Sequence, residues 1–247
     1  MRNIKLTIEY DGKDFNGWQK QPNKLNIQGT IEEAIKRITG EEVELMASGR
    51  TDRGVHALAQ VANFKTNSNL DINKFPIAIN SNITKAIRIK NAEEVDEKFH
   101  SRLSCKRKTY RYVINNSKYG SSIYRNLETH IPQKLDVDKM KQAVKYFEGE
   151  HDFKAFKSSG TSSKSSVRTI YKAEVIEKED NRIWIELTGN GFLYNMVRII
   201  SGTLVDVGLG KIKPGEIKDI INSKDRQKAG KTLAPQGLFL VKVEYEQ

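Results

Sequence analysis

Both halves of this sequence carry the same order of strand-like and helix-like segments, and this repeat restricts the possible folds more than any other feature. Alternating apolar and polar residues indicate strands, and apolar residues at helical spacing indicate helices. In the first half the expected elements are a strand at 3–10, a helix at 27–40, strands at 41–48 and 55–65, a helix at 72–83 and a strand at 86–95. In the second half they are a strand at 108–116, a helix at 136–149, strands at 167–180 and 181–192, helices at 193–208 and 213–223, and a closing strand at 237–246. Apart from the additional helix at 213–223, each half therefore follows the order strand, helix, strand, strand, helix, strand, which is that of a split βαβ unit.

This order predicts an α+β protein with two ferredoxin-like or RRM-like halves built on antiparallel sheets. The first domain is expected to span residues 1–105 and the second residues 106–247. A chain of 247 residues is long enough for two such domains with substantial apolar cores.

The chain carries a large excess of positive charge, with 42 Lys and Arg against 31 Asp and Glu and a formal net charge of +11. Such an excess favours acidic partners, of which nucleic acid is the commonest large one. Lysines are spread along the whole sequence. Charge alone therefore leaves a general lysine bias of the proteome as an alternative.

Several classes of protein are disfavoured by what the sequence lacks. No apolar run approaches the length needed to cross a bilayer, and the first residues lack the apolar block of a signal peptide. The single cysteine, Cys105, allows no internal disulfide, and the four histidines are scattered without the spacing of a metal site. We therefore expect a reduced, cytoplasmic setting, no membrane association and no bound metal.

The stretch "SGRTDRGVHALAQ", at 48–60, places a carboxylate between two arginines in a turn flanked by glycines. Arg50 and Asp52 are two residues apart, so an extended backbone would project them to the same face. A neighbouring guanidinium lowers the pKa of a carboxyl group and keeps it ionised. The pattern makes Asp52 a candidate catalytic residue, with Arg50 and Arg53 beside it.

Three other interpretations of this turn remain open at this point. The first is a solvated loop with surface ion pairs and no catalytic role. The second is a hydrolytic triad of Ser48, Asp52 and His56, although no GxSxG sequence accompanies it. The third is a metal-dependent phosphoesterase using Asp52 and His56, which the lack of clustered carboxylates in the sequence disfavours.

Two further segments place basic residues among aromatic or apolar ones. In "CKRKTYRYVI", at 105–114, alternation places Lys108, Tyr110 and Tyr112 on one face. This pattern suits RNA bases and phosphates, but it also suits an ordinary sheet. Arg198 interrupts an otherwise apolar helix, so it either extends its stem to the surface or pairs with a carboxylate from elsewhere in the fold.

Residues 158–166, "SSGTSSKSS", form the only low-complexity segment of the sequence. The simplest interpretation is a flexible surface loop. The alternative is a loop that becomes ordered on a polyanion through its hydroxyls and the basic residues Lys157, Lys164 and Arg168.

Taken together, these segments resemble the TruA family of tRNA pseudouridine synthases over nearly the whole chain. The stretches that carry the resemblance are, in order, "YDGKDFNGWQKQPN", "IQGTIEEAI", "GRTDRGVHA", "FHSRLSCKRKTYRYVI", "GEHDFKAF", "VRTI", "GFLYNMVRIISGTLVDVGLGK" and "APQGLFLVKVEY". The resemblance to the family's most specific motif implies that Asp52 is the nucleophile. It also implies that Tyr110 lies in the active site and that Arg198 pairs with Asp52.

The resemblance further implies a fold, an assembly and a reaction. The two halves would join into one extended antiparallel or mixed sheet with a basic cleft between them, and the protein would be a homodimer without metal or organic cofactor. It would isomerise uridine to pseudouridine at positions 38, 39 and 40 of the tRNA anticodon stem-loop. The sequence leaves open whether Asp52 attacks C1′ or C6 or acts as a base at C2′, and a non-catalytic RNA-binding protein remains the main alternative. Substrate contacts are expected from Tyr110, Arg50, Arg53, Arg111, Lys108 and Arg168.

Overall fold

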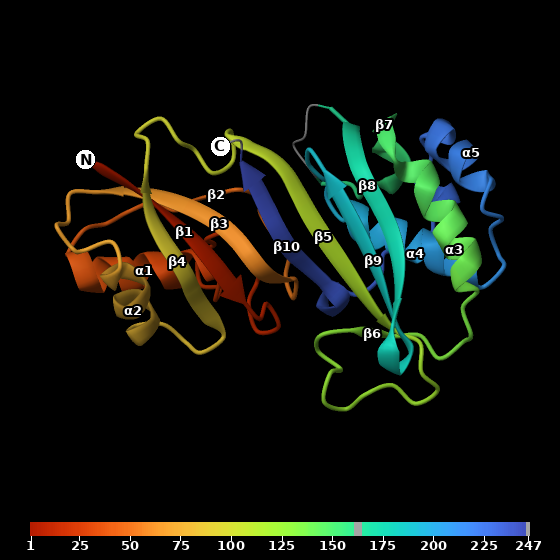
Figure 1. Cartoon of the computed structure of the whole chain (residues 1–247), viewed down its shortest axis with the longest axis horizontal. Helices are drawn as coiled ribbons and strands as arrows, with labels where there is room; N and C mark the ends of the chain where they lie inside the picture. The colour runs from red at the N-terminus through yellow and green to blue at the C-terminus, as the bar shows by residue number, and fades with distance from the viewer. Residues whose placement is uncertain (161–164, 246–247) are drawn as a thin grey trace. The chain divides into compact units, whose positions relative to one another are not determined.

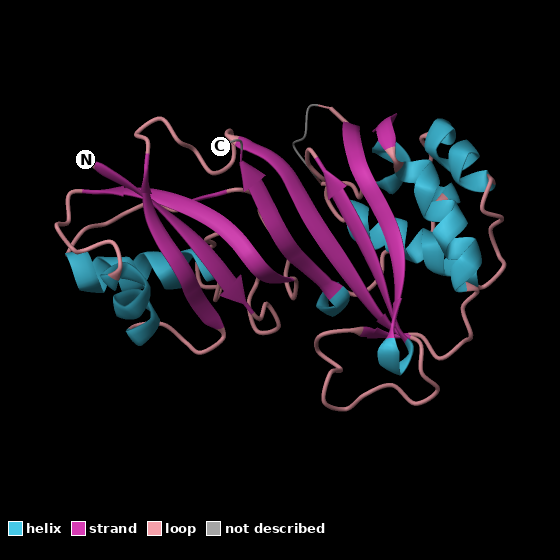
Figure 2. Cartoon of the chain, viewed as in Figure 1, coloured by secondary structure: helices cyan, strands magenta, loops and turns pink. Residues whose placement is uncertain are grey.

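The computed structural model describes residues 1–160 and 165–245, and the chain forms two compact units (Figures 1 and 2). The first consists of Met1–Lys106 and the stretch that begins at Phe239, and the second of Arg107–Leu238. The sheet of each unit contains antiparallel and parallel pairs. The protein is therefore an α+β protein with mixed strand pairing. The closing strand lies almost entirely in the first unit, although the sequence order placed it in the second half.

The first unit contains the strand and helix order that its sequence predicts. Its elements are β1 (Arg2–Tyr10), α1 (Ile27–Thr39), β2 (Met46–Ala47), β3 (His56–Thr66), α2 (Lys74–Ser81), β4 (Ile87–Val95) and β10 (Leu238–Tyr245). The strand order in the sheet is β4, β1, β3, β10, with β2 also paired to β3. β1 runs antiparallel to β3 and β4, whereas β10 runs parallel to β3. Figure 1 shows α1 and α2 on the same face of this sheet.

Alternation along β1 builds the core between this sheet and its helices. Ile4, Leu6 and Ile8 are fully buried, as the two-residue period of a strand predicts. Ile31 and Ile35, one turn apart on α1, are equally buried. Burial of side chains of this size contributes about 1.5–3 kcal/mol each. This apolar cluster stabilises the sheet of β1 and β3. The turn that joins β2 to β3 is held by this sheet.

The strand expected at 41–48 is much shorter than predicted, because only Met46–Ala47 pair with β3. Side chains of α1 bind the backbone just before this pair. The Leu45 N–H donates to Glu32 Oε1 at 3.0 Å, and Gln28 Nε2 donates to the Leu45 carbonyl oxygen at 3.4 Å. These bonds satisfy peptide groups that a longer strand would have paired with its neighbour.

The second unit has the strand order β5, β9, β8, β7, with a two-residue strand, β6, parallel to β5. Its helices and strands are β5 (Cys105–Asn115), β6 (Thr129–His130), α3 (Val137–Val144), β7 (Gly149–Asp152), β8 (Val167–Lys178), β9 (Arg182–Gly189), α4 (Met196–Gly208) and α5 (Glu216–Ser223). Short 3-10 turns occur at Lys145–Phe147, Phe153–Phe156, Glu179–Asn181, Arg226–Lys228 and Pro235–Gly237.

Two helices of the second unit are shorter than the sequence predicts. The helix expected at 136–149 ends at Val144 and continues as a 3-10 turn. The helix expected at 193–208 begins at Met196, because Asn195 has left-handed backbone angles, φ 61° and ψ 6°. An α-helix cannot extend through a residue in that conformation.

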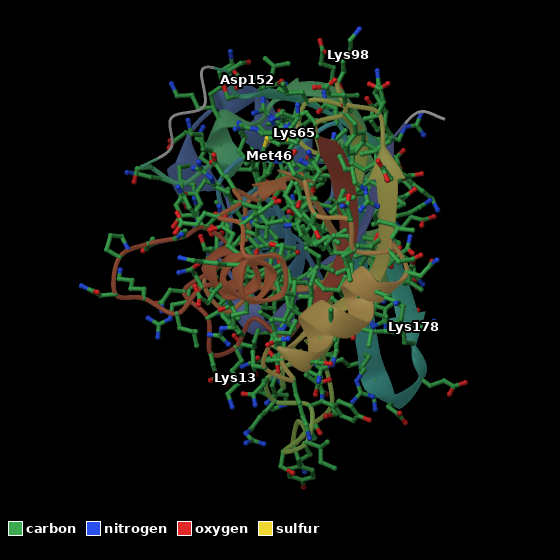
Figure 3. All side chains as sticks on the ribbon, turned by 90° about the vertical axis from the view of Figure 1, so that its left-hand side faces the viewer. Lys13, Met46, Lys65, Lys98, Asp152 and Lys178 are labelled. Atoms are coloured by element: carbon green, nitrogen blue, oxygen red, sulfur yellow. The ribbon has the colours of Figure 1, made fainter. Side chains whose placement is uncertain are left out.

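None of the helices in the described residues combines the length and the apolar character that crossing a membrane requires. Figure 3 shows Lys13 and Lys98 near opposite ends of the first unit. These two lysines therefore lie apart in space.

Candidate active site

The turn that contains Asp52 joins β2 to β3, and neighbouring groups bind its backbone. Thr51 is buried, and its Oγ1 lies 2.7 Å from the Tyr10 hydroxyl oxygen. The Thr51 carbonyl oxygen accepts the Trp18 N–H at 3.0 Å. The Val55 N–H donates to the Asp52 carbonyl oxygen at 3.1 Å and closes the turn. The backbone is thus bound on both sides of Asp52.

Gln60, a fully buried residue of β3, binds the start of the same turn. Its Oε1 accepts the Ser48 hydroxyl at 2.7 Å, and its Nε2 donates to the Gly49 carbonyl oxygen at 2.9 Å. Depriving a buried polar group of its partner costs about 1–3 kcal/mol. The sequence pattern does not predict Gln60 and Tyr10 as supports of this turn. The signal that could have revealed Gln60 is a polar amide within a largely apolar strand.

The charged side chains of the turn remain accessible. Arg50 and Arg53 are exposed and Asp52 is half-buried, whereas Thr51 is only 6% exposed. The adjacent loop packs closely on the turn at Gly17, where an added Cβ would lie 2.6 Å from the Thr51 carbonyl oxygen. The structure therefore brings Arg50, Asp52 and Arg53 together on a rigidly supported turn.

His56 is buried, and its observed partners differ from those of a catalytic base. Its Nδ1 accepts the Gly12 N–H at 3.0 Å, and its ring stacks on Phe239 with centroids 4.8 Å apart. Asp11 Oδ1 also lies 3.1 Å from His56 Nδ1. These contacts, with the Ser48 bond to Gln60, disfavour the hydrolytic triad.

In the second unit, Tyr110 lies on the buried face of β5. It is 9% exposed and meets Phe192 edge to face, with ring centroids 5.1 Å apart. Tyr112, two residues on, is fully buried, and its hydroxyl donates to the Ala234 carbonyl oxygen at 2.7 Å. Alternation along β5 therefore places both tyrosines on one face, as the sequence predicts.

Arg198 lies in the first turn of α4, and its guanidinium binds two acceptors, one at the N-cap of the same helix and one in a segment distant in the sequence. Its Nε donates to the Leu233 carbonyl oxygen at 2.6 Å, and its Nη1 donates to Asn195 Oδ1 at 2.7 Å. The positive charge of Arg198 also acts on the Tyr112 hydroxyl, although burial dominates and raises the Tyr112 pKa above its ordinary value. Arg198 and the tyrosine face of β5 are therefore neighbours within the second unit.

The backbone that supplies the Leu233 acceptor is itself closely packed on α4. A Cβ at Gly202 would lie 1.9 Å from the Lys231 carbonyl oxygen, so only glycine permits this approach. The Gly230 N–H donates to the buried Thr203 hydroxyl at 2.9 Å. These contacts fix the segment that orients the Arg198 guanidinium.

Comparison with known proteins identifies the family of this chain. Residues 6–103 and 143–246 match the family model described as tRNA pseudouridine synthase. The chain belongs to the tRNA pseudouridine synthase family. Asp52 and Arg198 lie within the matched stretches, and Tyr110 lies between them.

Full-length relatives in this family are closely similar to the chain. It is 57% identical over 245 residues to tRNA pseudouridine synthase A of Caldicellulosiruptor bescii, which covers 99% of this chain and 100% of the relative. The corresponding protein of Acetivibrio thermocellus is 52% identical, and tRNA pseudouridine synthase A 2 of Clostridium perfringens is 55% identical, both with the same coverage. Among solved structures, a Cbf5-Nop10-Gar1 complex is similar with a TM-score of 0.38 and 16% identity, over 96% of this chain and 57% of that chain. A similarity at that level decides nothing about activity or assembly.

Two other basic residues expected to contact the substrate, Arg111 and Arg168, bind groups of the protein itself. Arg111 binds Glu186 Oε1 at 2.6 Å and lies 3.7 Å from the Trp184 ring centroid. It projects from the opposite face of β5 to Tyr110. Arg168 donates through Nη1 to the Ser165 and Val167 carbonyl oxygens at 3.0 and 2.6 Å.

Lys108 precedes Tyr110 on β5 and is half-buried. Of the serine-rich segment 158–166, residues 161–164 lie outside the described residues, so the expectation that it orders on a polyanion stays a prediction. In the part of the chain that the structure describes, no group of three or more His, Cys, Asp and Glu side chains is arranged to bind a metal ion.

Proposed function

We propose that this protein isomerises uridine to pseudouridine in the tRNA anticodon stem-loop, at positions 38, 39 and 40, with Asp52 as the reacting carboxylate. The observation that carries the proposal is the Asp52 turn of this family member. Its flanking residues are fixed by buried hydrogen bonds to Tyr10 and Gln60, while the Asp52 side chain remains accessible. A reacting group on a preorganised support loses little entropy when the substrate binds.

The reaction needs an ionised carboxylate and no external reactant. The N1–C1′ bond of the uridine breaks, the uracil turns, a bond forms between C5 and C1′, and the C5 proton passes to N1 or solvent. Asp52 reacts with the nucleoside at C1′, C6 or C2′. The target base must leave its stack to reach such a group, as in other base-modifying enzymes.

We assign supporting roles to Tyr110 and Arg198, and infer that the two units contribute to one active site. Tyr110 would stack on the uracil, because its ring is already fixed edge to face by Phe192. Arg198 would keep Asp52 ionised through its positive charge. Its guanidinium is suited to this role because Leu233 and Asn195 fix its orientation.

Phosphate contacts are proposed for Arg50, Arg53, Lys108 and Arg168. The first three lie within two residues of Asp52 or Tyr110 in the sequence. Arg111 is left out of this set, because Glu186 and Trp184 already bind its guanidinium. These contacts would follow the backbone of the stem-loop and carry little base specificity.

The proposed function comes with proposals for the sheet, the RNA-binding cleft and the assembly of the protein. We infer two split βαβ halves whose strands form one extended sheet, with a basic cleft between the halves that takes the anticodon arm. We also infer a cytoplasmic homodimer. Exposed apolar side chains of the second unit support a homodimer: Tyr119 is 84% exposed and Ile123 is 79% exposed.

The function is tested by incubating the purified protein with unmodified tRNA transcripts and mapping pseudouridine along each transcript. We expect pseudouridine at positions 38, 39 and 40 where uridine occurs there, with a yield unchanged by a metal chelator. Binding without any pseudouridine would favour the non-catalytic RNA-binding protein. Turnover that stops on chelation would contradict a metal-free mechanism.

Tyr10→Phe tests whether the buried support of the Asp52 turn matters for the reaction. It removes one hydroxyl and leaves Thr51 Oγ1 without its 2.7 Å partner. We expect a loss of about 1–3 kcal/mol in the free energy of unfolding. The single-turnover rate should also fall by roughly tenfold, because the carboxylate is less well placed.

Tyr245→Phe is the matched control for this variant. The Tyr245 hydroxyl donates to the Ser101 carbonyl oxygen at 2.8 Å in the same unit, and burial raises the pKa of both tyrosines. Both phenols are therefore neutral hydroxyl groups, and the two substitutions remove the same group. Equal single-turnover rates in the two variants would show that the Tyr10 bond stabilises the fold without positioning Asp52.

A further inference from the structure

Asn195 lies at the start of α4 and makes two side-chain hydrogen bonds in opposite directions. Its Oδ1 accepts from Arg198 Nη1 at 2.7 Å, and its Nδ2 donates to Ser158 Oγ at 3.0 Å. We propose that Asn195 is a positioning residue that orients the Arg198 guanidinium and links it to Ser158. The inference rests on the role in pseudouridine formation proposed above for Arg198.

Chemistry fixes which atom of the amide faces each partner. An arginine side chain has donors and no acceptor, so only the oxygen of Asn195 can bind Arg198. The amide nitrogen then faces Ser158, whose hydroxyl oxygen accepts. One planar amide binds both partners. A displacement of the Ser158 oxygen would therefore rotate the Asn195 amide and move the oxygen that binds Arg198.

The bond from Asn195 supplies an orientation that the Leu233 bond alone does not. Arg198 Nε donates to the Leu233 carbonyl oxygen at 2.6 Å, whereas a different nitrogen, Nη1, donates to Asn195. Two bonds to different nitrogens of a rigid fork fix both its location and its rotation. The hydrogen bond to Leu233 holds the Nε atom and does not by itself fix the position of Nη1.

The backbone at this point favours asparagine over other amides. Asn195 has φ 61°, and its carbonyl oxygen accepts the Ile199 N–H at 3.0 Å in the first turn of α4. Asparagine enters this left-handed region more readily than most residues that carry a side chain. Glycine enters it equally well. Asn195→Gly therefore removes the amide and keeps the backbone conformation.

Ser158 is bound twice to the residues that precede α4. Its N–H donates to the Tyr194 carbonyl oxygen at 3.2 Å, and its Oγ accepts from Asn195. Ser158 is also the first residue of the serine-rich segment for which RNA contact is predicted. A contact that moves Ser158 would reach Arg198 through a single amide group.

Four variants separate the two bonds of Asn195 from general effects on stability. Asn195→Gly removes both bonds, Asn195→Asp keeps an acceptor for Arg198, and Ser158→Ala removes only the acceptor for Nδ2. The control is Asn181→Gly, which removes the side chain of another left-handed asparagine, φ 58°, in the turn between β8 and β9. Melting temperature and tRNA affinity are measured on every variant.

Two measurements report on the Arg198 guanidinium, one on its role in the reaction and one on its hydrogen bonding. The first is the single-turnover rate at saturating tRNA. The second is solvent exchange of the Arg198 Nε–H, followed by NMR on protein labelled with 15N-arginine and assigned by the signal lost in Arg198→Lys. We expect Asn195→Gly to lower the rate by roughly ten- to hundredfold, with affinity changed less than about threefold and faster Nε–H exchange. Asn195→Asp should retain more of the rate than Asn195→Gly, and Ser158→Ala should show a smaller loss.

A rate for Asn195→Gly equal to that of Asn181→Gly, or unchanged Nε–H exchange, contradicts the proposal. If Asn195→Gly fails to fold, unchanged rate and exchange in Ser158→Ala contradict the link to Ser158, and loss of Nε–H protection in that variant supports it. A parental rate in Arg198→Lys would instead contradict the proposed catalytic role of the Arg198 fork. The exchange measurement would still decide whether Asn195 orients the guanidinium.

Discussion

Asp52→Asn should reduce pseudouridine formation to background, a loss of more than roughly a thousandfold in single-turnover rate. Asparagine keeps the shape of the side chain and removes the charge that the proposed mechanism requires. The variant should fold like the parent, because Tyr10 and Gln60 support the turn through bonds that do not involve the carboxylate. Its tRNA affinity should be equal or slightly higher, since a negative charge is lost near the bound phosphates.

Asp138→Asn is the charge-matched control for this variant. Asp138 lies in the first turn of α3 and pairs with Lys141 on the surface at 3.6 Å, so its removal changes the net charge equally. An exposed pair of this kind contributes little to stability, and we expect parental rates. Substantial turnover by a well-folded Asp52→Asn protein would overturn the assignment of Asp52.

Arg198→Ala should have the second largest effect, a loss of roughly a hundredfold near neutral pH that grows as the pH falls. Without the guanidinium, the Asp52 carboxyl would be protonated at pH values where the parent is still ionised. The rate of the variant relative to the parent should therefore decrease as the pH is lowered and recover partly as it is raised. Loss of the bonds to Leu233 and Asn195 should also lower the melting temperature.

Arg182→Ala separates stability from chemistry in this comparison. Arg182 Nε binds the buried carboxylate of Glu128 at 2.8 Å within the same unit. Its removal should destabilise the fold, because a buried charge loses its partner, while the pH dependence of the rate stays parental. A rate ratio for Arg198→Ala that is constant with pH would contradict the proposed pairing with Asp52.

Sequence periodicity predicts most of the elements because the apolar faces that it detects are also the faces that pack. The helix at 27–40 and the strand at 3–10 appear within a residue or two, and Ile4, Leu6 and Ile35 are fully buried. The Asp52 turn was also predicted, since the glycines and charges around it stand out between two strand-like segments. The roles of Asp52, Tyr110 and Arg198 stay predictions.

Other features depend on contacts between residues far apart in the sequence, which periodicity does not record. The strand at 41–48 is short because Glu32 and Gln28 bind the backbone before Met46. The closing strand lies in the first unit because Phe239 and Leu240 pair with β3. The left-handed Asn195 looks like an ordinary polar residue in the sequence until its partners are known.

The most direct measurement of the central claim is a structure of the Asp52→Asn protein bound to an unmodified tRNA with uridine at position 39. The account predicts that this nucleotide has left its stack and that the residue 52 side chain is within about 3.5 Å of its C1′, C6 or C2′ atom. The Tyr110 ring should lie against the uracil, with the Arg198 guanidinium beside residue 52. A target nucleotide bound away from residue 52, or a site without Tyr110 and Arg198, would contradict it.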